Sequence, residues 1–109
     1  MRAIRPVTEM APILREAGQW GLIASAASDG KPYHFISRFF APDKGILEDP
    51  VTGSAHCVLT PFWATRLGKK SLHAFQASPR GGDILCADDG ARVTLSGHCA
   101  LYMRGEIEV

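Results

Sequence analysis

Residues 54–67 carry the feature that most constrains the fold, because their apolar side chains surround most of a predicted helix. The apolar residues of this segment include Cys57, Val58, Leu59, Phe62, Trp63, Ala64 and Leu67. A helix that is apolar on almost every side is usually buried. Gly68 is a natural end for it. The rest of the chain therefore has to supply a surface that covers this helix.

The segments around this helix have the patterns of short strands and one further helix. Apolar residues recur at three- and four-residue spacing over residues 7–17, which predicts a helix. Apolar or alternating runs predict strands at residues 20–27, 33–40, 72–77, 84–87, 92–96 and 100–109. Asp-Gly pairs at Ser28–Lys31 and Asp88–Gly90 are typical of hairpin turns. We therefore expect an α+β fold, with a mixed or mainly antiparallel sheet curved around the helix at 54–67.

Length and charge exclude several classes of protein. The 109 residues (11.8 kDa) suit a single domain over residues 1–109. A net charge of +1 gives no basic field for a phosphate backbone, so nucleic-acid binding is not expected. No apolar run approaches the roughly 20 residues of a membrane span, and no signal peptide follows Met1. These features predict a cytoplasmic protein without membrane contact.

The cysteines and histidines do not form a metal-binding pattern. Cys57, Cys86 and Cys99 are odd in number and lack a CxxC spacing, which favours reduced thiols over a disulfide framework. None of the four histidines has a zinc-site spacing to another ligand, so we predict no metal. We expect Cys57, Phe62 and Trp63 to lie in the core.

The start of the predicted helix at 54–67 is the best candidate for a binding site. The first N–H groups of a helix have no partner within it, and they attract anions together with the helix dipole. Gly53 lets a ligand approach the backbone closely, and the Ser54 hydroxyl adds one donor. Asp49, five residues before Ser54, could transfer or orient a proton. The alternative is that Thr52 or Ser54 only caps the helix and Asp49 only favours its positive end.

A longer motif contains these residues. It reads Arg38-Phe39-Phe40-Ala41-Pro42, then Glu48-Asp49-Pro50-Val51-Thr52-Gly53-Ser54-Ala55-His56, then Gln76-Ala77-Ser78 with Arg80-Gly81-Gly82, and Gly105-Glu106-Ile107 near the end. This pattern resembles the phenazine-biosynthesis PhzF family of the diaminopimelate-epimerase-like superfamily. The resemblance extends over essentially the whole chain.

The resemblance implies a fold and an activity. Members of that family are more than twice this length and consist of two similar halves, each a curved sheet around a central helix, with the active site between them. The chain resembles the C-terminal half. The implied chemistry is cofactor-free proton transfer at a carbon atom of a small carboxylate substrate, as in an isomerase or epimerase.

The resemblance also implies roles for individual residues. Asp49 matches the aspartate that faces the catalytic glutamate across the cleft. Gly53 and Ser54, with the neighbouring Ala55 and His56, match the helix start that holds substrate. The loop Arg80-Gly81-Gly82 matches a conserved loop nearby. The catalytic glutamate and a substrate-contacting histidine belong to the N-terminal half, and nothing in this chain matches them.

Two hypotheses about function remain open at this point. In the first, the chain is an incomplete isomerase that must meet an N-terminal lobe. In the second, it is a stand-alone domain that binds a small carboxylate without catalysis and covers its apolar face by forming a homodimer. Neither hypothesis calls for a metal or a cofactor.

Overall fold

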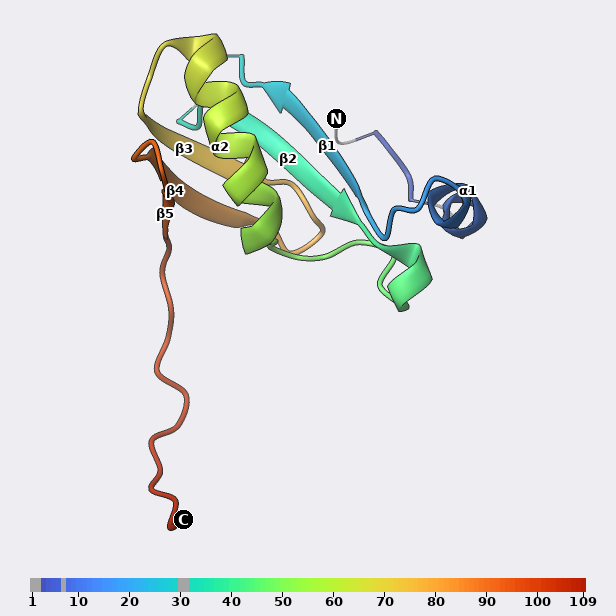
Figure 1. Cartoon of the computed structure of the whole chain (residues 1–109). Helices are drawn as coiled ribbons and strands as arrows, with labels where there is room; N and C mark the ends of the chain where they lie inside the picture. Colours follow the sequence, from blue (N-terminus) through green and yellow to red (C-terminus); the bar gives the residue numbers. More distant parts are fainter. Residues whose placement is uncertain (1–2, 7, 30–31) are drawn as a thin grey trace.

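A computed structural model describes residues 3–6, 8–29 and 32–109 of the chain (Figure 1). Its elements in chain order are α1 (Met10–Glu16), β1 (Leu22–Ala27), β2 (Phe35–Phe40), the short 3-10 helix η1 (Pro42–Lys44), α2 (Gly53–Leu67), β3 (Ser71–Gln76), β4 (Gly82–Asp88) and β5 (Val93–Ser96). The α+β class is confirmed, and so are seven of the eight predicted elements.

The five strands form one mixed sheet in the order β1-β2-β3-β4-β5. β2 and β3 run parallel at the centre, and the other neighbouring strands run antiparallel. Parallel neighbours need a long crossover, and α2 lies within that crossover. It lies across one face of the sheet (Figure 1). The sheet therefore has β1 and β5 as its two edges, with α2 over its middle.

Alternation along the strands sends one set of side chains toward α2. On β3 these are Leu72 and Ala74, and on β4 they are Ile84 and Cys86. They pack with Leu59, Ala64 and the stacked rings of Phe35 and Trp63, whose centroids are 5.7 Å apart. The Trp63 indole N–H donates to the Ser25 hydroxyl at 3.3 Å. The prediction that Trp63 lies in the core is confirmed.

The outer side of α2 differs from the prediction. Val58 is 64% exposed, Phe62 is 44% exposed, and the Cys57 thiol is also exposed. The expectation that Cys57 and Phe62 lie in the core is therefore wrong. The reason is that a five-stranded sheet covers only one side of the helix, and no described element lies on the other side (Figure 1).

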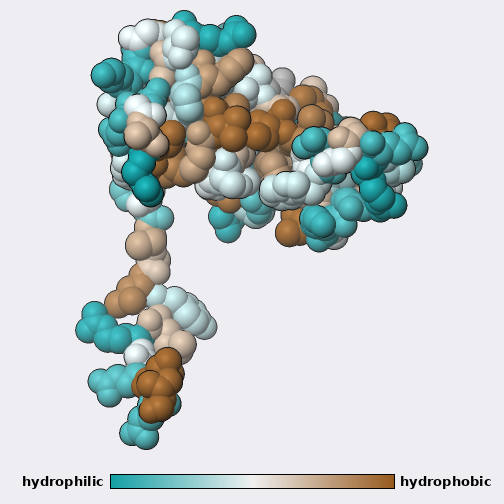
Figure 2. All heavy atoms as spheres, in the orientation of Figure 1, coloured by the Kyte–Doolittle hydropathy of each residue, from teal (hydrophilic) through white to brown (hydrophobic). Residues whose placement is uncertain are grey.

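The predicted strand at residues 100–109 is also wrong. These residues have no regular secondary structure, are exposed, and extend from β5 as a tail that stands clear of the body (Figures 1 and 2). A strand exists only where its N–H and C=O groups meet a neighbour, and no described strand flanks this segment. At the other end of the chain α1 begins at Met10, which places Pro12 in the first turn, and Val7 lies outside the described residues.

The hairpin predicted at Ser28–Lys31 includes Gly30 and Lys31, which are outside the residues that the structure describes. The strands on its two sides pair antiparallel, with Ala27 opposite Phe35. This pairing is the one that a hairpin produces.

Candidate functional site

The loop before α2 positions Asp49. The Thr52 hydroxyl donates to Oδ2 of Asp49 at 2.5 Å, and the Asp49 N–H donates to the Phe39 carbonyl at 2.9 Å. Asp49 is half-buried. The first bond orients the carboxylate, and the second fixes the Asp49 backbone between the end of β2 and the start of α2.

Gln76, at the end of β3, anchors the loop that carries Asp49 and Thr52 through its side chain. Its side chain is almost fully buried. The Gln76 amide nitrogen donates to the Asp49 carbonyl at 2.8 Å and to Oγ1 of Thr52 at 3.0 Å, and its oxygen accepts the Thr52 N–H at 2.8 Å. Because the Gln76 amide donates to Oγ1 of Thr52, the hydroxyl hydrogen of Thr52 is left to point at Asp49. Gln76 and Thr52 thus orient the carboxylate of Asp49.

A buried ion pair supports the loop on its other side. Arg38 donates from Nε and Nη2 to the two carboxylate oxygens of Glu48, at 2.6 and 2.8 Å. Both side chains are 7% exposed. The hydrogen bond to Glu48 raises the pKa of Arg38, although burial opposes this shift. The pair fixes the residue that immediately precedes Asp49.

Ser78 joins the same loop to the Arg80-Gly81-Gly82 turn. Its hydroxyl donates to the Pro50 carbonyl at 2.7 Å and accepts the Gly81 N–H at 3.0 Å. The two segments that the motif separates by about 30 residues are therefore held together by one side chain.

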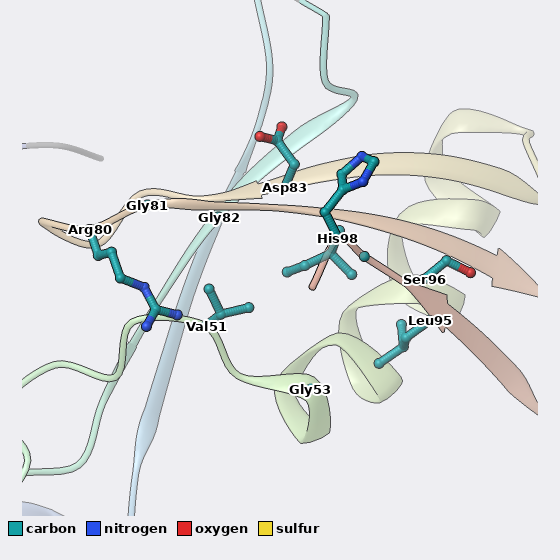
Figure 3. Close-up of a pocket in the computed structure, with 11 residues that line it drawn as sticks. Val51, Gly53, Arg80, Gly81, Gly82, Asp83, Leu95, Ser96 and His98 are labelled. Carbon is teal, nitrogen blue, oxygen red and sulfur yellow. The ribbon is translucent and has the colours of Figure 1, made fainter. Parts of the chain in front are cut away.

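A cavity of about 500 Å³ opens where this turn meets the start of α2 and the end of β5 (Figure 3). Its lining includes four predicted site residues, Gly53, Arg80, Gly81 and Gly82. The Arg80 side chain extends along one wall toward Val51 (Figure 3). Val51, Ile84 and Leu95 supply apolar lining, and Asp83 and His98 add polar groups. A cavity with one guanidinium and an apolar wall suits a small organic anion.

Two glycines of the turn have steric reasons to be glycine. A Cβ on Gly82 would lie 2.3 Å from Cγ2 of Val51. Gly81 has φ of +72°, and a Cβ there would lie 2.9 Å from the Phe75 ring. Close packing against Val51 and Phe75 therefore accounts for both positions independently of any ligand.

The first turn of α2 is not capped by a side chain. Thr52 occupies the N-cap position but makes no side-chain cap hydrogen bond, since its hydroxyl is used by Asp49 and Gln76. The capping alternative for Thr52 is therefore wrong. Ser54 is exposed, whereas Ala55 is buried against Phe39 and Ala41. The N–H groups of this turn keep their capacity to bind an anion.

His56 lies in the core rather than in the cavity. It is fully buried, its Nδ1 lies 2.7 Å from the Thr52 carbonyl, and its Nε2 lies 3.1 Å from the Ser37 hydroxyl. Nδ1 therefore carries the hydrogen in the neutral ring, and Nε2 accepts from Ser37. Burial lowers the pKa of His56 below its ordinary 6.5, although the bond to Thr52 opposes the shift.

We predict that His56 makes the fold sensitive to mild acid. The unfolded chain binds this proton more tightly than the folded chain, so the stabilisation is complete above pH 6.5 and decreases as the pH falls below it. The loss has a slope of at most about 1.4 kcal/mol per pH unit. Urea unfolding between pH 7 and pH 5 measures it. His56→Gln should flatten this dependence and His98→Gln, at an exposed position, should not; equal pH dependence in all three proteins would contradict the prediction.

Sequence reasoning missed three residues that build the site, namely Thr52, Gln76 and Ser78 as positioning groups. The spacing Asp49-x-x-Thr52 was a local signal, because a hydroxyl three residues after an aspartate is within reach of it. Gln76 and Ser78 belong to the motif, but the sequence predicted no role for them. Their contacts with residues 49–52 join segments distant in the chain, and no local pattern reveals such contacts.

The described residues contain no group of three or more His, Cys, Asp or Glu side chains placed to hold a metal ion. Within the same residues, no helix is long and apolar enough to cross a membrane. Cys57, Cys86 and Cys99 are free thiols, and burial raises the pKa of Cys86.

Comparisons with known proteins agree on one family. The family model for phenazine biosynthesis-like proteins (PhzC-PhzF) matches residues 6–105. An uncharacterized isomerase of Pseudomonas aeruginosa is 48% identical over 109 residues, which are all of this chain and 40% of the relative. A phenazine biosynthesis-like domain-containing protein of Rattus norvegicus is 43% identical over 96% of this chain and 38% of its own length.

A solved structure gives the same result for the fold. The crystal structure of a Clostridium difficile protein assigned to the phenazine biosynthesis PhzC/PhzF proteins superposes with a TM-score of 0.79 and 37% identity. The superposition covers 98% of this chain and 40% of that one. The chain thus spans about 40% of the length of the proteins that it matches.

Proposed function

The chain belongs to the phenazine biosynthesis-like (PhzC-PhzF) family, and from this premise we propose that it forms the substrate-holding part of an isomerase. The reaction is proton transfer at a carbon atom of a small carboxylate, without a cofactor. Asp49 is the acid or base on this side of the cleft, and the start of α2 holds the carboxylate.

The observation that carries this proposal is the uncapped first turn of α2 beside an oriented aspartate. Gly53 and Arg80 both line the cavity. The positive end of the α2 dipole and the Arg80 guanidinium therefore both favour an anion there. Asp49 is anchored by Thr52 and by backbone bonds, which suits a group that must meet a carbon atom in a fixed geometry. His56 has no part in the proposal, because both of its nitrogens are engaged in the core.

The proposed reaction needs a second carboxyl group to deliver or remove the other proton. By resemblance that group is a glutamate of an N-terminal lobe, and such a lobe also excludes water from the cleft. We therefore propose that this chain acts with a partner lobe, in a cytoplasmic setting.

The second candidate function is a small-carboxylate-binding domain that self-associates and does not catalyse. It is favoured by the exposed apolar side chains on the outer side of α2, which another copy could cover. In this case the anion site is used for binding, and Asp49 only shapes it.

We predict that Ser54→Ala weakens binding of a small carboxylate about tenfold, because one hydrogen bond to a charged group is lost. The measurement is a titration of the full chain with 2-aminobenzoate, followed by amide NMR shifts of the first turn of α2. Thr65→Ala, an exposed hydroxyl at the far end of the same helix, is the matched control. Equal affinity in Ser54→Ala and Thr65→Ala would remove the start of α2 from the site.

An assay of proton transfer distinguishes the two candidate functions. The chain is mixed in D₂O with the N-terminal remainder of the Pseudomonas relative and with an L-amino acid, whose Cα–H lies next to a carboxylate, and deuterium incorporation at Cα is followed by NMR. The isomerase proposal expects incorporation that Asp49→Asn abolishes while binding is kept. Binding without any incorporation favours the second candidate.

A further inference from the structure

Two buried polar side chains, Ser37 of β2 and His56 of α2, form a hydrogen-bonded pair next to the start of α2. Ser37 is 1% exposed and His56 is fully buried. The His56 ring stacks on Phe35, with ring centroids 6.0 Å apart. An apolar ring would make this contact without burying two nitrogen atoms, which is costly unless both are hydrogen-bonded. The polar atoms of the pair therefore call for an explanation beyond core packing.

The hydrogen bonds of the pair run in one direction. His56 Nδ1 lies 2.7 Å from the Thr52 carbonyl oxygen, which only accepts, so Nδ1 carries the ring hydrogen. Nε2 then accepts the hydrogen of the Ser37 hydroxyl, 3.1 Å away. Ser37 therefore holds the ring in the tautomer and the orientation in which it donates to Thr52.

The His56 side chain is the closer of two donors to the Thr52 carbonyl. Thr52 is the N-cap residue of α2, and the carbonyl of such a residue normally accepts the first backbone bond of the helix. Here that donor is the backbone nitrogen of His56, and it is 3.4 Å from the oxygen. The ordinary distance is about 2.9–3.0 Å. The side chain of His56 thus holds this carbonyl more firmly than the helix backbone does.

The carbonyl that His56 holds belongs to the same peptide group as the Gly53 N–H. A trans peptide group is planar, with its C=O and N–H on opposite sides, and the described residues contain no cis peptide bond. A bond that draws the Thr52 oxygen toward His56 therefore points the Gly53 N–H away from the body of the helix. That N–H has no partner within the helix, and Gly53 lines the cavity (Figure 3).

The same bond also strengthens the Gly53 N–H as a donor. Resonance couples the oxygen and the nitrogen of a peptide group, so a donor on the oxygen makes the N–H more positive. The peptide group before Thr52 is held as well, because its N–H donates to the Gln76 side chain. With both of its peptide groups fixed, Thr52 keeps its hydroxyl directed at Asp49.

We propose that Ser37 and His56 are positioning residues of the anion site, acting through the Thr52–Gly53 peptide group. They direct the Gly53 N–H into the cavity and strengthen its bond to a carboxylate, without touching the ligand. This inference rests on the proposed function, since it assigns to that site two residues of the core that lie outside the cavity.

Two substitutions of His56 retain different halves of the ring and test the proposal. The amide nitrogen of Asn can take the place of Nδ1, and that of Gln can take the place of Nε2. We expect His56→Asn to keep the bond to Thr52, so that its Kd for 2-aminobenzoate changes less than about twofold. His56→Gln loses this bond, and its Kd should rise about tenfold, the effect of losing one hydrogen bond to a charged group.

The chemical shift of the Gly53 backbone nitrogen tests the positioning in the free chain. This shift responds to a hydrogen bond on the preceding carbonyl, so we expect it to move upfield in His56→Gln relative to His56→Asn. Both variants lack the ring, so the difference between them reports the bond and not the ring. Ser37→Ala keeps the ring but frees it to turn, and it should shift Gly53 in the same direction even if the His56 variants do not fold.

Thr60→Val is the matched control for a loss of stability alone. The buried Thr60 hydroxyl donates to the His56 carbonyl in the same helix, and it makes no printed contact with the loop before α2. Its removal should lower the free energy of unfolding, because a buried hydrogen bond is lost, without changing the Gly53 shift or the Kd.

The outcomes separate this inference from the proposed function. A Gly53 shift and a Kd that change equally in His56→Asn and His56→Gln, or that change as much in Thr60→Val, overturn the positioning role and keep the anion site. If 2-aminobenzoate does not bind the unchanged chain, the proposed function is overturned. The Gly53 shift of the free chain then decides the positioning role by itself.

Discussion

Arg38→Ala will destabilise the fold by about 3–5 kcal/mol, which for a domain of this size is a large part of its total stability. The substitution leaves the Glu48 carboxylate 7% exposed and without its two hydrogen bonds. It also removes the guanidinium that lies 4.9 Å from the centre of the Phe40 ring and donates to the Ile4 carbonyl. Urea unfolding followed by tryptophan fluorescence measures the loss.

A second arginine of the chain provides the matched control. Arg15 forms an ion pair with Asp43, but its side chain is 67% exposed. Exposed pairs contribute little, so Arg15→Ala should leave the unfolding midpoint close to that of the unchanged chain. The double variant Arg38→Met with Glu48→Leu should recover much of the stability, because no unpaired charge then remains buried. If Arg38→Ala and Arg15→Ala had equal effects, the buried pair would have no special role.

Gln76→Leu is the second large effect, and we expect a loss of about 2–5 kcal/mol. The substitution keeps much of the side-chain volume but removes the partners of the Thr52 N–H and the Asp49 carbonyl. Each buried group left without a partner costs about 1–3 kcal/mol. The loop that carries Asp49 should also loosen, since the bond from the Ser78 hydroxyl to the Pro50 carbonyl is left to hold it to the segment after β3.

Two measurements check this prediction. Urea unfolding gives the stability, and amide hydrogen exchange at Thr52 reports the loosening of the loop directly. Gln19→Leu makes the same chemical change at an exposed residue and should affect neither. Unchanged exchange at Thr52 in Gln76→Leu would mean that Ser78 and the backbone hold the loop without Gln76.

The sequence allowed the elements to be predicted where a local pattern was sufficient. The helix around Trp63 and the strands from Leu22 to Ser96 follow from apolar spacing and from Asp-Gly turns. The exposure of Cys57 and Phe62 was not predicted, because the sequence shows that this helix is apolar on almost every side but not how many strands cover it. The strand predicted at residues 100–109 was wrong for a similar reason. Its apolar residues alternate as they do in a strand, but a strand also needs a neighbouring strand to pair with.

The candidate site was predictable in part. The motif brought attention to Asp49, Gly53 and Arg80, and the structure places the last two at one cavity. The same reasoning placed His56 beside them because it follows Ser54 by two residues. On a helix that distance turns a side chain toward a different face, and here it turns toward Phe35, with ring centroids 6.0 Å apart. Chain neighbours on a helix are thus poor guides to a shared site.

The parallel pairing of β2 with β3 makes the order of folding matter for the site. β1 with β2, and β3 with β4 and β5, are contiguous antiparallel units that can form early. The two units meet where Phe35, Ile36 and Ser37 of β2 pair with Ala74, Phe75 and Gln76 of β3. A slip of one residue at this seam would turn Gln76 to the opposite face and bring Phe75 beneath Thr52. Asp49 is therefore oriented only in molecules whose two units have paired in the correct register, so a chain with the wrong register would lack the proposed site.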